Sequence, residues 1–312
     1  MRNTRRNKDL HEAYIHIHGI DGLNDVLSQL AACTQYAIRH KRSIIFDIQT
    51  YNQEELEKIF DFSEFPVRVY TNVKEKLNEL KHLPKIPKSR NGKYPIRFDL
   101  NRPYPRDVIL FYGSGKGGNP TLKNATHRQR HIFEYLRFTD DFIDDYMKVK
   151  HATGIREDYI GLHLRSTDRK LNTQNTINGG TEENTIAVKK IPQEENTHQE
   201  SLKKIEAFIA ANPNLPVYVA TDNIKLLDKL KETHPNILSS YTALESAQCI
   251  SNRECNPLHR WVKKEPHVLK HALIDLFLLA NASKLMTSAG GFSRLASALS
   301  RKKSLVKKLL TK

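Results

Sequence analysis

The sequence predicts an α/β protein built from two Rossmann-like halves that face each other across a cleft. Near its start, a strand, a glycine-containing turn, a helix and a second strand follow one another within about 35 residues, the size of one βαβ crossover. The second half repeats this alternation, which is typical of parallel sheets covered by helices. A chain of 312 residues is also long enough for two domains of ordinary size.

The first crossover begins with the run AYIHI, which alternates like a strand and leads into GIDGLND. Apolar residues then recur with helical spacing over residues 26–38, and the run RSIIFDI has the composition of a buried parallel strand. The turn after the first strand carries Gly22, Asn24 and Asp25. Open α/β sheets bind ligands at that edge, so this turn is a candidate part of a binding site.

The remainder of the first half is predicted to be rich in loops. Residues 80–106 are rich in proline and basic side chains, which favour neither helix nor strand. The run DVILFYGSGKGG predicts a strand and a glycine loop, but Lys116 is followed by Gly117 instead of the serine or threonine of a nucleotide P-loop. The run HRQRHIFEYLRFTDDFIDDYMKVK is predicted to be helical and to close a first domain, residues 1–152.

The second half opens with the strand YIGLHL, and the polar residues 171–200 that follow predict a mobile insertion. The helix SLKKIEAFIAANPN, the strand LPVYVATDN and the helix KLLDKLKETHP come next. The helix ALIDLFLLA, the short strand KLMTS and a turn at Gly290-Gly291 lead into a further helix. We expect a second domain over residues 153–294 and a basic C-terminal helix over 295–312.

Polar side chains gather at three predicted strand ends of the second half. The carboxyl ends of neighbouring parallel strands converge on one crevice, so the three groups are expected to share a site. They are His163, Arg165, Asp168 and Arg169; Thr221, Asp222 and Asn223; and the turn from Ser288 to Ser293.

These groups suit a nucleoside diphosphate. Arg165 can grip a phosphate with two parallel hydrogen bonds. The turn at Gly290-Gly291 leads into a helix N-terminus, where backbone N–H groups and the helix dipole favour an anion. Asp275 lies in an otherwise apolar helix, where it either accepts hydrogen bonds from a base or ribose or is an ordinary carboxylate of the helix surface.

Four short blocks, in order, resemble the fucosyltransferase superfamily with a GT-B fold, which includes α1,6-fucosyltransferases, nodulation fucosyltransferases and protein O-fucosyltransferases. HLRSTDR resembles the H-x-R motif, and VYVATDN resembles the second motif. IDLFLLANASKLMTSAGGFSRLASAL is similar to the third motif, and GIDGLNDVLSQLAACTQYAIRHKRSIIFDI is similar to the family's opening glycine loop and helix.

The resemblance implies an inverting glycosyltransferase that moves a sugar, most often fucose, from a GDP-sugar in the second domain to an acceptor bound by the first. No cofactor and no obligatory metal are expected. Arg165 would stabilise the diphosphate leaving group as negative charge develops on it. His163 and Asp275 would hold the guanine. The expected site is Arg165 and Asp168 as catalytic residues, with His163, Arg169, Thr221, Asp222, Asp275, Ser288, Gly290, Gly291, Phe292, Ser293, Gly22 and Asn24 as donor-binding residues.

Two departures from the family pattern matter, and the second leaves the catalytic base open. Gly290-Gly291 stands where the family often has paired serines, so backbone donors would serve there. A glutamate sometimes found about ten residues after the motif histidine is Thr173 here. The candidate bases are therefore Asp168, Asp25 and Glu182.

The net charge of +15 favours an anionic partner, but it does not choose among nucleic acid, acidic lipid and phosphorylated substrates. An alternative is therefore a non-catalytic Rossmann-type protein that binds nucleotide or nucleic acid through its basic surface. The sequence has neither an RNP motif with aromatic and basic residues interleaved nor a helix-turn-helix signature.

Three cysteines fit a reducing compartment. The set Cys249, Cys255, His259 and His267 matches no common zinc pattern, so no metal is expected there. The basic start lacks the apolar core of a signal peptide, and no apolar run reaches the ~18 residues of a membrane span. We expect a cytoplasmic enzyme whose acceptor is a glycan or lipid-linked oligosaccharide, used for a cell-surface polysaccharide or lipooligosaccharide.

The C-terminal segment is basic and carries leucines at helical spacing. One interpretation is a final helix that packs its leucines on the first domain. The other is peripheral attachment to anionic lipid on the inner membrane face, which would bring the enzyme to a lipid-linked acceptor.

Overall fold

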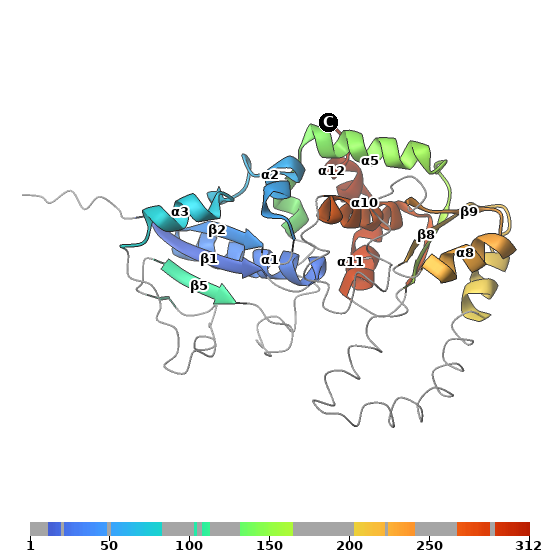
Figure 1. Cartoon of the computed structure of the whole chain (residues 1–312), viewed down its shortest axis with the longest axis horizontal. Helices are drawn as coiled ribbons and strands as arrows, with labels where there is room; N and C mark the ends of the chain where they lie inside the picture. The colour runs from blue at the N-terminus through green and yellow to red at the C-terminus, as the bar shows by residue number, and fades with distance from the viewer. Residues whose placement is uncertain are drawn as a thin grey trace, which may run out of the picture. The chain divides into compact units, whose positions relative to one another are not determined.

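The computed structural model describes residues 12–19, 22–48, 51–82, 103–104, 108–112, 132–164, 203–221, 224–240, 267–287 and 291–312. The chain divides into two compact units, Met1–Asp141 and Phe142–Lys312 (Figure 1). Each unit has its own four-stranded sheet of parallel strands, so the predicted α/β class is confirmed. The division at Asp141 lies before the domain boundary expected at residue 152, because most of the helix between them belongs to the second unit.

The first unit is built around the predicted βαβ crossover. Strand β1 (Ala13–Gly19) leads to helix α1 (Leu23–His40) and to strand β2 (Arg42–Ile48), which is parallel to β1 with Ala13 opposite Arg42. Helix α1 ends where Lys41 adopts a left-handed conformation, φ 52°, and donates its backbone N–H to the carbonyls of the last turn. Strands β4 (Val69–Tyr70) and β5 (Val108–Tyr112) complete the sheet in the order β4-β2-β1-β5.

Short elements surround this sheet. They are the 3-10 helix η1 (Gln53–Glu55), helix α2 (Leu56–Ile59), strand β3 (Phe60–Asp61), helix α3 (Val73–Glu79) and strand β6 (Arg137–Phe138). The glycine loop expected at 113–118 and most of the proline-rich segment expected at 80–106 fall outside the described residues.

The prediction that residues 127–150 are helical throughout is wrong at one point. Residues 132–135 are helical, but β6 then pairs antiparallel with β3, and the Phe138 ring stacks on Phe60 with centroids 5.5 Å apart. Thr139 donates its backbone N–H to the carbonyl of Ile59 at 3.0 Å, so this N–H is not used in a helix. Helix α5 (Asp140–Ala152) starts immediately afterwards with two acidic residues, which favour a helix N-terminus.

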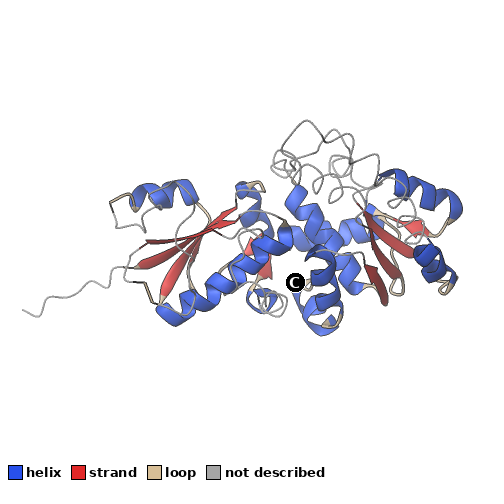
Figure 2. Cartoon of the chain, turned by 90° about the horizontal axis from the view of Figure 1, so that it is seen from below, coloured by secondary structure: helices blue, strands red, loops and turns tan. Residues whose placement is uncertain are grey.

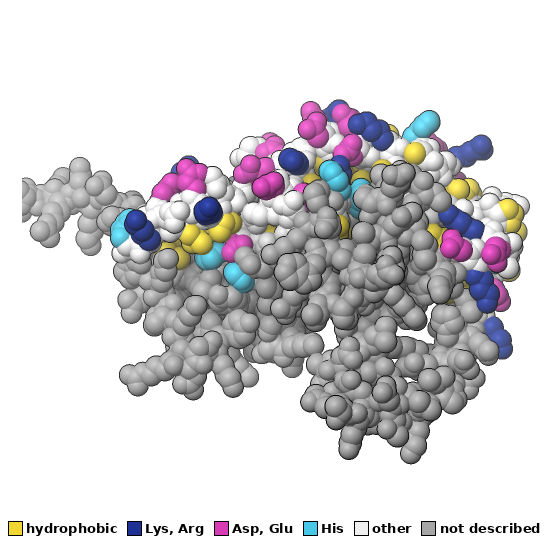
Figure 3. Space-filling model, viewed as in Figure 1, with side chains coloured by type: hydrophobic (Ala, Val, Ile, Leu, Met, Phe, Trp, Pro, Cys, Tyr) yellow, Lys and Arg dark blue, Asp and Glu magenta, His cyan; other side chains and the backbone are white. Residues whose placement is uncertain are grey.

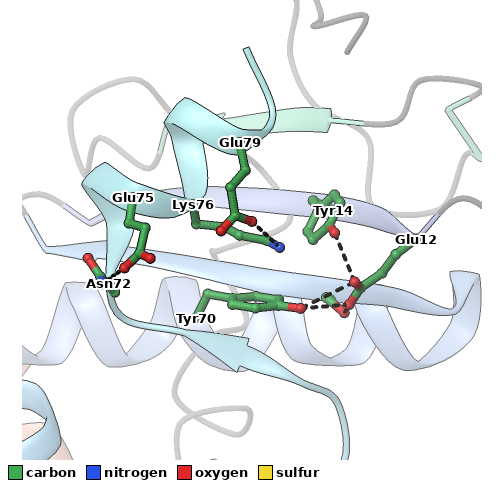
Figure 4. Close-up of polar contacts among 8 residues, drawn as sticks. Glu12, Tyr14, Tyr70, Asn72, Glu75, Lys76 and Glu79 are labelled. Carbon is green, nitrogen blue, oxygen red and sulfur yellow. Dashed lines mark hydrogen bonds and ion pairs between the residues drawn. The ribbon is translucent and has the colours of Figure 1, made fainter. Parts of the chain in front are cut away.

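A polar cluster closes the amino-terminal end of the first sheet (Figure 4). Glu12 accepts hydrogen bonds from the Tyr14 hydroxyl at 2.8 Å, from the Tyr70 hydroxyl at 3.2 Å and from Ser43. The ammonium of Lys76, on α3, lies 4.2 Å from the centre of the Tyr70 ring. Burial raises the pKa of Glu12, but the hydrogen bonds outweigh it and the pKa is lowered. The cluster therefore ties α3 to the sheet through an ionised carboxylate and a cation–π contact.

The second unit contains the strands β7 (Ile160–Leu164), β8 (Val217–Thr221), β9 (Ile237–Leu238) and β10 (Lys284–Thr287), in the order β10-β7-β8-β9. Its helices are α5, residues 203–210, α8 (Ile224–Thr233), α10 (Val268–Asn281), α11 (Gly291–Ser300) and α12 (Lys303–Leu309) (Figure 2). The strands predicted at YIGLHL, LPVYVATDN and KLMTS are confirmed. The insertion expected at 171–200 lies outside the described residues.

The second sheet is buried on both faces, as parallel sheets require. Ile160, Leu162 and Leu164 alternate along β7 and belong to one apolar cluster with side chains of residues 203–210 and α8. Gly161 lies on the other face, where an added Cβ would come 2.9 Å from the Cβ of Ala282, just after α10. Helix α10 is apolar on nearly all sides. This is the pattern of a buried helix, and the sheet, α11 and α12 enclose it.

The C-terminal segment is not a single helix. Helices α11 and α12 are separated at Arg301 and Lys302, and both pack on α10 within the second unit. Lys303 donates from Nζ to the carbonyls of Ala280 and Ala282 at 2.7 and 2.6 Å, which neutralises the C-terminal end of α10. In the described part of the chain, no helix combines the length and the apolar character needed to cross a membrane.

The buried His271 of α10 makes the stability of the fold sensitive to acid. Burial, with help from the charge of Lys270, lowers its pKa from 6.5 to about 4, although Asp145 opposes the shift. The unfolded chain therefore binds the proton more readily, and the stabilisation present above pH 6.5 is lost as the pH falls toward 4. Between pH 7 and pH 5 we expect the free energy of unfolding to fall by about 2 kcal/mol from this residue.

Urea unfolding at pH 7 and pH 5 tests this expectation. The variant His271→Gln has no imidazole to protonate and should lose less stability between the two pH values, whereas His151→Gln, at an exposed position of α5, should behave like the wild type. An equal loss in all three proteins would show that His271 is not responsible.

Candidate functional site

The carboxyl end of β7 meets the start of α11. His163 lies one residue before the end of β7, and its Nδ1 is 2.6 Å from the hydroxyl oxygen of Ser293. The His163 ring also lies against Phe292, with centroids 4.9 Å apart. Both His163 and Ser293 are buried. The structure therefore brings together three residues predicted for the donor site from segments 130 positions apart in the sequence.

The N-terminus of helix α11 lies beside the contact of His163 with Ser293 and Phe292. It begins at Gly291, as the glycine turn predicted, and its first turn carries no acidic residue. Strand β10 precedes it and is parallel to β7, with Thr287 opposite His163. The first N–H groups of a helix have no partner within that helix. Those of α11 and the positive end of its dipole thus lie at the carboxyl edge of the sheet, which favours a phosphate group there.

Thr221 lies at the same edge of the sheet. It is the last residue of β8 and is the register partner of Leu164, next to the pair His163 and Ala220. Its position agrees with the convergence of strand ends expected from the sequence.

Asp275 lies on helix α10. One of its carboxylate oxygens accepts hydrogen bonds from the hydroxyl of Tyr218 at 2.5 Å and from Ser240 at 2.7 Å. Burial raises the pKa of Asp275, and these two hydrogen bonds oppose the rise. Asp275 is therefore more than a simple surface carboxylate, since it links α10 to β8 and to the segment after β9. The sequence offered no signal for Tyr218 or Ser240 as its partners.

The remaining predicted residues fall into two groups. Gly22, Asn24 and Asp25 belong to the first unit, where the Gly22 carbonyl accepts the backbone N–H of Asp25 at 2.9 Å at the start of α1. The others lie outside the described residues: Arg165, Asp168, Arg169, Thr173, Glu182, Asp222, Asn223, Ser288 and Gly290, together with Cys249, Cys255 and His259.

A second cluster, in the first unit, was not predicted. His16 Nε2 and His18 Nδ1 lie 3.1 and 3.2 Å from the same carboxylate oxygen of Asp47. Burial raises the pKa of Asp47, but hydrogen bonds from the two histidines outweigh it and hold the pKa far below its usual range. The signal in the sequence was the alternation His-x-His near the end of a strand, which places both rings on one face of the sheet.

The described surface carries charges of both signs. Figure 3 shows dark blue and magenta side chains interspersed over the visible face of both units. The described part of this face therefore shows no continuous basic patch of the kind on which nucleic-acid-binding proteins depend.

Comparison with known proteins gives a match in structure but not in sequence. No protein-family model matches the chain, and no curated protein matches it. The NodZ α-1,6-fucosyltransferase co-crystallised with GDP has a TM-score of 0.59 at 16% identity, with 92% of each chain covered. NodZ soaked with GDP-fucose has a TM-score of 0.57 at 18% identity, again with 92% of each chain covered. POFUT1 in complex with GDP has a TM-score of 0.51 at 12% identity, covering 93% of this chain and 96% of POFUT1. The chain thus has the fold of these fucosyltransferases, as the four sequence blocks predicted.

Proposed function

We propose that the protein is a GDP-sugar-dependent glycosyltransferase of the fucosyltransferase type, with the donor bound by the second unit. The observation that carries the proposal is the contact of His163 with Ser293 and Phe292, next to the N-terminus of α11. This contact brings a buried imidazole and a helix N-terminus together at one edge of a parallel sheet, and such a helix end favours an anion. Structures with the same fold were obtained with GDP and with GDP-fucose, which supports guanosine diphosphate as the leaving group.

In this proposal the two units form a GT-B enzyme that inverts the configuration at the transferred sugar carbon. Arg165 directly follows in the sequence the last residue of β7, whose carboxyl end lies at the edge where the diphosphate is expected. Its guanidinium would stabilise the charge that develops on the β-phosphate as the glycosidic bond breaks. Arg169, Thr221, Asp222 and the Ser288 to Ser293 turn would hold the ribose and phosphates.

The remaining points of the proposal concern the metal requirement, the catalytic base, the acceptor and contact with a membrane. The transfer would need no metal, since arginine and the helix N-terminus supply positive charge. The acceptor hydroxyl would lose its proton to one of the candidate bases Asp168, Asp25 and Glu182. A glycan of a surface polysaccharide or lipooligosaccharide would be the acceptor. Contact with the inner membrane face would depend on the basic side chains, since Val306 and Leu309 of α12 are buried in the protein.

A panel of nucleotides in a thermal-shift measurement tests the donor. A ligand that binds only the folded protein stabilises it by about 2.7 kcal/mol at a concentration 100 times its Kd. GDP should therefore raise the melting temperature, while UDP and CMP at the same concentration should not. Stabilisation by UDP or CMP without stabilisation by GDP would contradict the proposal.

The variant Ser293→Ala tests whether the contact between His163 and Ser293 contributes to GDP binding. It removes the hydroxyl that bonds to His163 while leaving the helix intact, so GDP should bind more weakly by about 1 kcal/mol, or roughly fivefold. Ser297→Ala, one turn further along α11, is the matched control. Equal GDP affinity in both variants would remove Ser293 from the donor site.

A further inference from the structure

The cluster of His16, His18 and Asp47 belongs to the first unit, whereas the contact of His163 with Ser293 and Phe292 belongs to the second. His16 and His18 are two residues apart on β1, so their side chains leave the same face of the sheet. Asp47, on β2, is the register partner of His18. His18 and Asp47 lie one residue before the carboxyl ends of these parallel strands, at the edge of an open α/β sheet where ligands bind.

The three groups are held closely by rigid elements. One nitrogen of each ring and one oxygen of the carboxylate lie within 4.8 Å of one another. The side chains of His16, His18 and Asp47 are only 11%, 25% and 13% exposed, so they are constrained by packing while His18 still reaches solvent. Strands position such groups more precisely than loops do.

We propose that this cluster binds one divalent transition-metal ion, of which Zn²⁺ is the representative, through His16 Nε2, His18 Nδ1 and a carboxylate oxygen of Asp47. Two ligand atoms that each lie about 2.1 Å from one ion are about 3.0 Å apart at a right angle and about 3.4 Å apart at the tetrahedral angle. The nitrogen-to-oxygen distances of 3.1 and 3.2 Å lie within that interval.

The ligand types select the class of metal. Imidazole nitrogen is a ligand for zinc, cobalt, nickel, copper and iron, whereas magnesium and calcium prefer oxygen ligands throughout. Three protein ligands leave at least one coordination position for water or another small ligand, as in an open zinc site. On binding, the ion takes the place of the protons between the rings and the carboxylate. The proposed sugar transfer does not require this ion.

Metal titration of the full chain, after treatment with a chelator and its removal, tests the proposal. Isothermal titration with Zn²⁺ should give one site per chain. Asp47→Asn and His18→Gln should each weaken binding by at least about 100-fold, because each removes a direct ligand. His151→Gln, at an exposed position of α5, should leave binding unchanged. Zn²⁺ binding of equal strength in all these proteins would overturn the proposal.

Absorption of Co²⁺ added to the wild-type chain keeps the proposal testable even if a variant does not fold. Nitrogen and oxygen ligands give visible d–d bands without a thiolate charge-transfer band, and that is the expected spectrum. A strong thiolate band would place the ion on cysteine, and an unchanged aqueous Co²⁺ spectrum would show that no such site exists. Either result would overturn the proposal. GDP binding is measured separately, so failure of the donor proposal and failure of the metal proposal are distinguishable.

Discussion

Replacing Arg165 by lysine should lower kcat by about 100-fold or more, a loss of about 3 kcal/mol in transition-state stabilisation. Lysine keeps the positive charge but loses the planar fork that holds two phosphate oxygens at once. The lost contact is strongest when the glycosidic bond breaks, so the Kd for GDP-sugar should change much less than kcat. Steady-state kinetics with a GDP-sugar donor, together with a direct measurement of donor affinity, checks both parts.

The control for this variant is Arg156→Lys, an exposed position shortly before β7 to which no role is assigned. It should leave kcat unchanged. Normal turnover by Arg165→Lys would exclude this side chain from the mechanism. A loss confined to KM would mean that Arg165 binds the donor in the ground state and the transition state equally.

Gly161→Val should lower the free energy of unfolding by about 3 kcal/mol. Gly161 lies in β7 between two neighbouring strands, and its missing side chain leaves room for the end of α10. A Cβ there would lie 2.9 Å from the Cβ of Ala282 and 3.1 Å from Leu285 Cδ1. Since the Ala282 Cβ is attached directly to the backbone, the helix end would have to move. Urea unfolding followed by circular dichroism measures the loss.

A double-mutant cycle identifies the cause. Gly161→Ala alone should cost about 1–2 kcal/mol, and the cost should shrink in the Ala282→Gly background, where the opposing methyl is absent. Additive effects of the two substitutions would mean that the contact with Ala282 is not responsible.

Several elements were predictable because their signal is local. The alternation in AYIHI and the continuous apolar runs RSIIFDI and YIGLHL identify strands, and all three are strands in the structure. The start of α11 was equally clear, since glycine precedes a run with helical spacing. The break at β6 was missed because the helical pattern on either side of it is strong, whereas the pairing of Phe138 with Phe60 depends on a distant segment.

The sequence by itself determined the two parallel sheets, the positions of their main strands along the chain and the edge at which polar groups gather. These follow from hydrophobic periodicity and from the handed, parallel connections that such a pattern permits. Only the tertiary structure decided which side chains meet: His163 with Ser293, Asp275 with Tyr218 and Ser240, and the pair of histidines with Asp47. The physical reason is that strand periodicity sets the face from which a side chain leaves, while contacts between segments far apart in the sequence depend on register and helix packing, which no local pattern encodes.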